Sequence, residues 1–241
     1  MNNQKYWEER AILKDKLLFK YINKLEKKIL SFFKNAKKNI LNEVKIFHTD
    51  MQITEYAKYQ IDNTLTNINS IIDNLYYKKE EEVLNAFSDV YYEFDKEANN
   101  DLNIKDVPNY INKSSIKEVI NDNWSGVTLD KRIKEHKRKL SFSIEEELNK
   151  GLIRGDSLQD IAKRISDKVD IAYSNAIRLV RTESCRIVNE ATINNYKNNG
   201  VEKYQIMAFL DNKTSKICRD MDGEVVNVKE AIPGKNLPPF H

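Results

Sequence analysis

Residues 172–200 read AYSNAIRLVRTESCRIVNEATINNYKNNG, and this stretch decides the fold class. Its apolar residues recur at the three- and four-residue spacing of one helix face: Ala176, Ile177, Val180, Ile187, Val188 and Ala191. We expect the helix to end at Asn198-Asn199-Gly200, because glycine readily adopts the left-handed conformation found after a helix C-terminus. The pattern therefore predicts a helix over 172–199.

The polar residues of this predicted helix fall on two further arcs. One arc carries Arg178, Arg181, Thr182, Cys185 and Asn189, and the other carries Glu183, Arg186 and Glu190. The second arc reads as a ladder of surface ion pairs, each worth about 0.2–0.5 kcal/mol. Arg181 borders the apolar arc, so we expect it to be partly buried and to bind a carboxylate or backbone carbonyls, in a structural role.

After Gly200 the pattern changes from helix to strand. Residues 204–210 and 224–228 are candidate strands, and Asp222-Gly223 between them is a tight-turn dipeptide. Asp211, Thr214 and Ser215 have the chemistry of a turn followed by a helix cap. Pro238 and Pro239 then stiffen the approach to His241. A small β-hairpin on a helical body is expected.

Upstream, apolar periodicity predicts helices over 4–47, 64–99, 115–122, 129–150 (ended by Gly151) and 157–168 (capped by Ser157 or Asp156), with a loop over 99–112. The chain has 241 residues but six Gly and four Pro, which favours helices over the many turns of a β protein. We predict a mainly α fold. A long N-terminal helical arm, 1–112, precedes a helical α+β module, 113–241, with the C-terminal β-hairpin.

Charge is concentrated near the N-terminus. Net charge is +3, but residues 1–50 hold twelve Lys/Arg and six acidic residues. These lysines are either a solvated helix face or a contact surface for DNA or an acidic partner. The candidates for such contact are Lys24, Lys27, Lys28, Lys34, Lys37 and Lys38.

Metal and enzyme signatures are incomplete. Cys218 and His241 suggest a zinc site, yet a structural zinc needs four ligands, and only Cys185, His48 and His136 are further Cys or His donors. We expect no complete metal site, no cofactor, and Cys218 as a small buried side chain. No Gly-rich phosphate loop, GxSxG or HExxH motif occurs, so no enzyme is predicted. The sequence contains no apolar run of membrane-spanning length, and its two cysteines predict a reducing cytosol.

The C-terminal residues, taken in order, resemble a known family. That series is Arg178, Arg181, Thr182, Glu183, Asn189, Tyr196, Asn199-Gly200-Val201, Asp211, Thr214-Ser215, Cys218, Asp222-Gly223 and Gly234 to Pro238-Pro239-Phe240-His241. It is similar to the phage Mu protein F-like minor head (head morphogenesis) proteins over roughly 130–241. The family's pattern continues beyond this histidine into a cysteine-rich cluster, so we expect the C-terminal end to be truncated, with zinc conceivable only through residues beyond His241.

The resemblance implies a minor capsid protein of a phage or prophage. Such a protein associates with the portal, and in some cases with scaffold or capsid proteins and double-stranded DNA, during head assembly, packaging or ejection. It would reside in the virion head interior, and in the bacterial host cytoplasm during assembly, with no membrane partner. Two alternatives stay open: an enzyme or toxin-delivery module (nuclease, peptidase or ADP-ribosyl transfer), and a plain DNA-binding protein.

Overall fold

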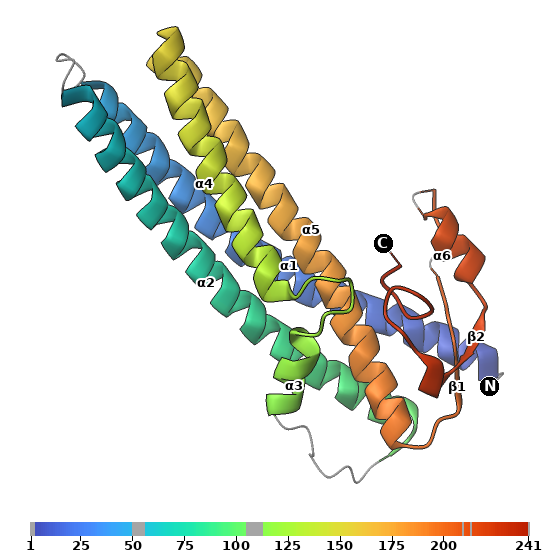
Figure 1. The fold of residues 1–241 in the computed structure, drawn as a ribbon. Helices are drawn as coiled ribbons and strands as arrows, with labels where there is room; N and C mark the ends of the chain where they lie inside the picture. The colour runs from blue at the N-terminus through green and yellow to red at the C-terminus, as the bar shows by residue number, and fades with distance from the viewer. Residues whose placement is uncertain (1–2, 50–55, 105–112, 209, 213, 241) are drawn as a thin grey trace. The chain divides into compact units, whose positions relative to one another are not determined.

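The computed structural model describes residues 3–49, 56–104, 113–208, 210–212 and 214–240 (Figure 1). In chain order the elements are α1 (Asn3–Thr49), α2 (Tyr56–Asp101), α3 (Lys113–Ile120), α4 (Leu129–Arg154), α5 (Leu158–Asn198), β1 (Lys203–Gln205), α6 (Lys216–Met221), β2 (Val225–Asn227) and a 3-10 turn (Val228–Glu230). The predicted mainly α fold with a small C-terminal hairpin is confirmed. None of the described helices is both long and apolar enough to cross a membrane.

Several helix boundaries differ from prediction: α2 begins at Tyr56 and not at residue 64, and α3 spans Lys113–Ile120 and not 115–122. α2 runs to Asp101, so the predicted loop begins later than residue 99. α4 continues through Gly151 to Arg154, and the break comes at Gly155, whose φ is +68°. The helices predicted over 157–168 and 172–199 are one helix, α5, because no Gly or Pro interrupts 168–172 and Val169 is buried in line with Ile165. The cap at Ser157 is confirmed, since its Oγ accepts a hydrogen bond from the Asp160 N–H at 3.2 Å.

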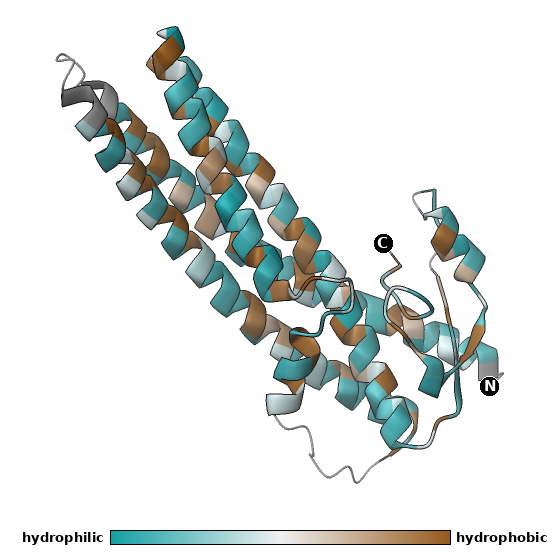
Figure 2. Cartoon of the chain, in the orientation of Figure 1, coloured by the Kyte–Doolittle hydropathy of each residue, from teal (hydrophilic) through white to brown (hydrophobic). Residues whose placement is uncertain are grey.

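The chain forms two compact units, and the long helices contribute segments to both. Unit 1 comprises Met1–Lys24, Leu84–Leu129 and Val180–His241, and unit 2 comprises Leu25–Val83 and Asp130–Leu179. Each unit contains residues from both sides of the predicted domain boundary at residue 112. That boundary therefore stays a prediction. Figure 2 shows apolar and polar residues recurring along the helices, as expected of amphipathic segments.

Unit 2 packs segments of α1, α2, α4 and α5 through isoleucine-rich stripes. Its fully buried side chains include Ile29, Ile40, Ile68, Ile72, Ile144 and Ile165. Aromatic contacts join the elements as well: the Phe33 ring meets Tyr76 edge-on at 6.3 Å and Tyr173 at 5.6 Å between centroids. Between α4 and α5, Arg164 binds the Glu147 carboxylate at 2.9 Å.

Unit 1 holds the C-terminal hairpin. β1 and β2 pair antiparallel in the register Lys203–Asn227, Tyr204–Val226 and Gln205–Val225. The strands are shorter than predicted, and α6 lies between them in place of a simple tight turn. Val228 and Leu237 pack with Ile193 of α5, which attaches the hairpin and the loop after it to the helical part of this unit.

The first test concerns Gly151, where α4 meets α5. A Cβ added there would lie 2.4 Å from Ile161 Cγ1 and 2.6 Å from its Cδ1, closer than atoms can approach. We predict that Gly151→Ala lowers stability by about 1–3 kcal/mol although alanine favours helices, because overpacking outweighs propensity. Thermal unfolding followed by circular dichroism measures it. Glu145→Ala, at an exposed site on α4, is the control; equal melting temperatures for the two variants would contradict the packing argument.

Candidate functional site

The centre of unit 1 is a buried arginine that the sequence pattern placed on a surface ladder. The Arg186 side chain is 0% exposed, and its Nε donates to Glu183 Oε2 at 2.8 Å. Its Nη1 donates to Glu190 Oε1 at 2.7 Å and to the Val119 carbonyl at 2.8 Å. Its Nη2 donates to the Ile120 carbonyl at 3.0 Å. The guanidinium thus binds two carboxylates of its own helix and two backbone oxygens.

Those two oxygens explain the position of the arginine. Val119 and Ile120 are the last residues of α3, where helix carbonyls lack partners within the helix. A planar guanidinium with five fixed N–H donors can serve both carbonyls and a carboxylate together. Arg186 therefore closes the end of α3 and fixes it against α5.

Trp124 extends this cluster towards the C-terminal loop. Its indole N–H donates to Glu183 Oε1 at 3.1 Å, so the Glu183 carboxylate is shared between Trp124 and Arg186. The Trp124 ring also lies close to Gly234, where a Cβ would come within 3.3 Å of Cζ3. We call Trp124, Glu183, Arg186 and Glu190, with the carbonyls of 119 and 120, the Arg186 cluster.

The electrostatics of the cluster favour a structural role. Burial raises the pKa of Glu190, and the Arg186 charge opposes that shift. Burial acts to lower the pKa of Arg186, but the two carboxylates outweigh it and the pKa is raised. Removing these charges from water costs several kcal/mol per ion, and the hydrogen bonds offset that cost only when all are made. Every group of the cluster is engaged within the fold, so no free carboxylate or guanidinium is presented to a substrate.

The partial burial predicted for Arg181 is wrong, whereas its binding of a carboxylate or carbonyls stays a prediction. Arg181 is exposed, and Arg186 holds the buried, carbonyl-bound position expected of it. The helical wheel failed because α5 is packed on more than one side in unit 1, so the third arc faces α3. The signal available in the sequence was the glutamate–arginine–glutamate spacing of 183, 186 and 190, together with Trp124.

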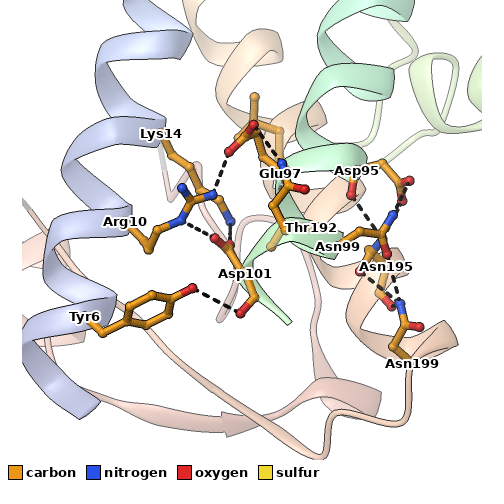
Figure 3. Close-up of polar contacts among 12 residues, drawn as sticks. Tyr6, Arg10, Lys14, Asp95, Glu97, Asn99, Asp101, Thr192, Asn195 and Asn199 are labelled. Atoms are coloured by element: carbon orange, nitrogen blue, oxygen red, sulfur yellow. Dashed lines mark hydrogen bonds and ion pairs between the residues drawn. The ribbon is translucent and has the colours of Figure 1, made fainter. Parts of the chain in front are cut away.

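A second polar group in unit 1 joins α1 to α2 (Figure 3). Asp101, whose side chain is 0% exposed, forms ion pairs with Arg10 and Lys14, and Arg10 also binds Glu97 at 2.6 Å. The Tyr6 hydroxyl donates to the Asp101 carbonyl at 3.3 Å. This cluster was not predicted from the sequence, because Asp101 was assigned to the loop over 99–112 and Glu97 was not singled out.

Asparagines join α2 to α5 beside it (Figure 3). The buried Asn195 donates through Nδ2 to the Asp95 carbonyl at 3.1 Å and to Asn99 Oδ1 at 2.8 Å. Asn199 donates to the Asn195 carbonyl at 2.9 Å. Asparagine was abundant along the whole chain, so composition could not single out these three.

The polar residues of the tail shape its turns. The Asp211 N–H donates to Thr214 Oγ1 at 2.8 Å, and the Ser215 hydroxyl accepts from the Cys218 N–H at 3.3 Å as the N-cap of α6. Asp222 Oδ1 accepts from the Ala208 N–H at 2.8 Å, and Gly223 follows with φ +83°. The turn and cap chemistry predicted here is present.

The remaining predicted residues lie apart from these clusters. Arg178 is exposed, while Thr182 and Asn189 are half-buried. Asn189 Nδ2 donates to the Cys185 carbonyl at 2.8 Å. Pro238 and Pro239 are joined by a cis peptide bond, and Pro239 is buried. These positions support the tail's path and do not converge on one site.

The α1 lysines are mostly exposed. Lys24, Lys27, Lys34 and Lys38 are exposed. By contrast, Lys28 binds Glu82 and Lys37 binds Asp170 at 2.6 Å, both within unit 2. Two of the six predicted contact lysines therefore already have carboxylate partners.

The two cysteines are free thiols, and neither is fully buried by exposed area. Cys218 is half-buried on α6, so its prediction as a buried side chain is wrong in degree. Burial raises the pKa of Cys185 to about 11, which disfavours the thiolate that metals bind. Within the described ranges no three His, Cys, Asp or Glu side chains gather as a metal site, and His241 lies outside those ranges.

The C-terminal part of the chain is similar to known proteins. Residues 143–241 match the model of the family described as Phage Mu protein F like protein. The chain is also 29% identical, over 124 residues, to the NAD(+)--arginine ADP-ribosyltransferase EFV of Enterococcus faecalis (strain ATCC 700802 / V583). That similarity covers 50% of this chain but 26% of the relative, so the chain spans about a quarter of that protein's length. No solved structure matches.

The hydrogen bonds of the Arg186 cluster predict a large loss of stability when Arg186 is replaced. Arg186→Met removes the charge at nearly constant volume and takes one donor each from Glu183, Glu190 and the two carbonyls of α3, although Glu183 keeps its hydrogen bond from Trp124. We expect a loss of about 3–5 kcal/mol, because an uncompensated buried charge remains. Urea unfolding followed by tryptophan fluorescence measures it, since Trp7 and Trp124 both belong to unit 1.

The matched control is Arg181→Met on the exposed face of the same helix. A change there is expected to stay within about 0.5 kcal/mol. If Arg186→Met were as mild as Arg181→Met, the cluster would not hold the unit together.

Proposed function

We propose, from the match of residues 143–241 to the Phage Mu protein F like family, that this chain is a minor protein of a phage head. The family match carries the proposal. The matched region contains three members of the Arg186 cluster and the whole hairpin in unit 1, and its residues 143–179 belong to unit 2.

The finer proposal is that the protein docks on the portal during head assembly. Three of the motif residues use their polar groups within the fold: Arg186 binds α3, Ser215 caps α6, and Asp222 accepts a hydrogen bond from the Ala208 N–H. We therefore look for the main partner contacts on other surfaces. The exposed lysines of α1 are the strongest basic candidate, and they would meet acidic side chains or, without sequence preference, DNA phosphates.

Ion pairing narrows this surface to four residues. Lys28 and Lys37 are paired with Glu82 and Asp170, and a partner would have to displace those carboxylates. The set expected to contribute most is Lys24, Lys27, Lys34 and Lys38.

Co-purification with the portal protein encoded in the same genome tests the proposal. We expect the two to co-purify at low salt, and the Gln substitution of Lys24, Lys27, Lys34 and Lys38 together to reduce recovery by about tenfold. The control replaces the equally exposed Lys117, Lys163, Lys197 and Lys229. Equal loss in both sets would indicate non-specific charge. Absence of the chain from purified heads and from the portal complex would overturn the proposal. If the chain instead shifts duplex DNA in a gel, and this binding weakens steeply as the salt concentration rises, the lysines are assigned to DNA contact.

A second candidate is ADP-ribosyl transfer, which the similarity to the Enterococcus faecalis relative favours. The match spans 50% of this chain but 26% of the relative, and the activity in the relative's name belongs to that whole protein. Within the described residues, Glu183 and Arg186 are committed to the buried cluster, which argues against their serving a substrate.

Incubation with labelled NAD+ and an arginine-rich acceptor tests this candidate. We expect no transfer of label to the acceptor. Arg181→Ala is a suitable diagnostic variant because Arg181 is exposed, whereas Glu183→Ala would disrupt the fold. Transfer that disappears in a folded Arg181→Ala variant would establish the enzyme and displace the structural proposal.

A further inference from the structure

Unit 2 contains a buried lysine without a counter-ion. Lys79 of α2 is 2% exposed, and its Nζ lies 4.0 Å from the centroid of the Tyr76 ring. Across the described residues the Nζ has no hydrogen-bond partner, and the same holds for Tyr76 Oη and His136 Nδ1. Three polar atoms in one helical unit are thus withdrawn from water without replacement bonds.

Such an arrangement is costly when the amine carries charge. A buried ammonium needs a carboxylate or hydrogen-bond acceptors, and an aromatic face compensates only in part. A neutral amine avoids the cost of burying a charge. The geometry therefore stabilises the form of Lys79 that lacks the extra proton.

The surrounding groups reinforce this preference. Glu80, adjacent on α2, is the acid that acts on Lys79, and its attraction is weaker than the effect of burial. From α4, His136 faces the positive charges of Lys79, Lys139 and Arg132, with Glu135 opposing them. From α1 and α5 the printed contacts are aromatic: Phe33 against Tyr76, and Tyr173 against Phe33.

We propose that Tyr76, Lys79 and His136 form a proton-sensitive element of unit 2, which packs most firmly when both bases are neutral and loosens as they take up protons. This device is independent of the C-terminal family region's role. It concerns α2 and α4, where proton uptake by Lys79 and then by His136 would promote opening of unit 2 as the pH falls.

The direction of the pH dependence of stability follows from the pKa shifts of Lys79 and His136. Burial lowers the pKa of Lys79 from 10.5 to about 7, so the unfolded chain binds the proton between these values and the folded chain does not. Stability then rises with pH from about 7 to 10.5, and the full penalty is present below 7. Burial lowers the pKa of His136 from 6.5 to about 4, which adds a further loss as pH falls through that window.

Amide hydrogen exchange read by mass spectrometry tests the proposal on the full chain. Fluorescence is unsuitable, because both tryptophans belong to unit 1. Peptides from α4 report on unit 2, and protection factors corrected for intrinsic rates remove the trivial effect of pH. We expect protection in α4 to rise by about tenfold or more from pH 7 to pH 9.

Lys79→Met should abolish most of that rise and should increase protection at pH 7. Lys78→Met, at the adjacent exposed lysine, should keep the wild-type rise. His136→Gln should reduce the decline between pH 6.5 and 5. A wild-type rise that persists in Lys79→Met, or no rise in the wild type, would overturn the proposal.

Should Lys79→Met fail to fold, lysine 13Cε NMR of the unmodified chain decides the matter. One lysine is expected to titrate with a midpoint near neutral pH. Titration of every lysine above pH 10 would show that Lys79 is not held neutral and would refute the device.

Discussion

The Arg186 guanidinium is the interaction on which unit 1 depends. It is fully buried, and its donors serve Glu183, Glu190 and the two carbonyls at the end of α3. Through Glu183 it also positions Trp124, against which the Gly234 backbone lies closely. A hydrocarbon side chain could fill the same volume but could not bind carbonyls, so α3 would lose its fixed register on α5. Buried ions of this kind specify an arrangement more than they add stability.

This constraint bears on function. The chain's most distinctive polar residues occur in its family-matched region, yet several of them, such as Asp211, Ser215 and Arg186, are used in turns, caps and the Arg186 cluster. Chemistry that required a free acid and base would have to use other groups. Of the six candidate lysines on α1, Lys28 and Lys37 pair with carboxylates, and the other four are exposed. An assembly role, in which a rigid folded module presents a basic helix, is consistent with that division.

Much of the fold followed from local signals. Apolar periodicity located α1, α2, α4 and the hairpin, and side-chain chemistry located the caps at Ser157 and Ser215. Gly151 was wrongly predicted to end α4. A glycine inside a helix can also permit close packing, and here Ile161 occupies the space that a Cβ would need. Burial was predicted for Arg181 and exposure for Arg186, the reverse of what is found, because a helical wheel gives the direction of a side chain but not the elements packed against it. The burial of Lys79, and the contact of Asn195 with Asn99, depend on which helices meet, which a single sequence does not state.

The central claim is that Arg186 is buried in the fold and hydrogen-bonded there through each of its three guanidinium nitrogens. Proton exchange of arginine Nε–H groups, measured by 15N NMR, tests this directly. The account predicts one arginine Nε–H resonance that exchanges with water far more slowly than the others and disappears in Arg186→Lys. Uniformly rapid exchange at all arginines would contradict it, because the guanidinium would then be open to solvent and could not be the anchor of unit 1.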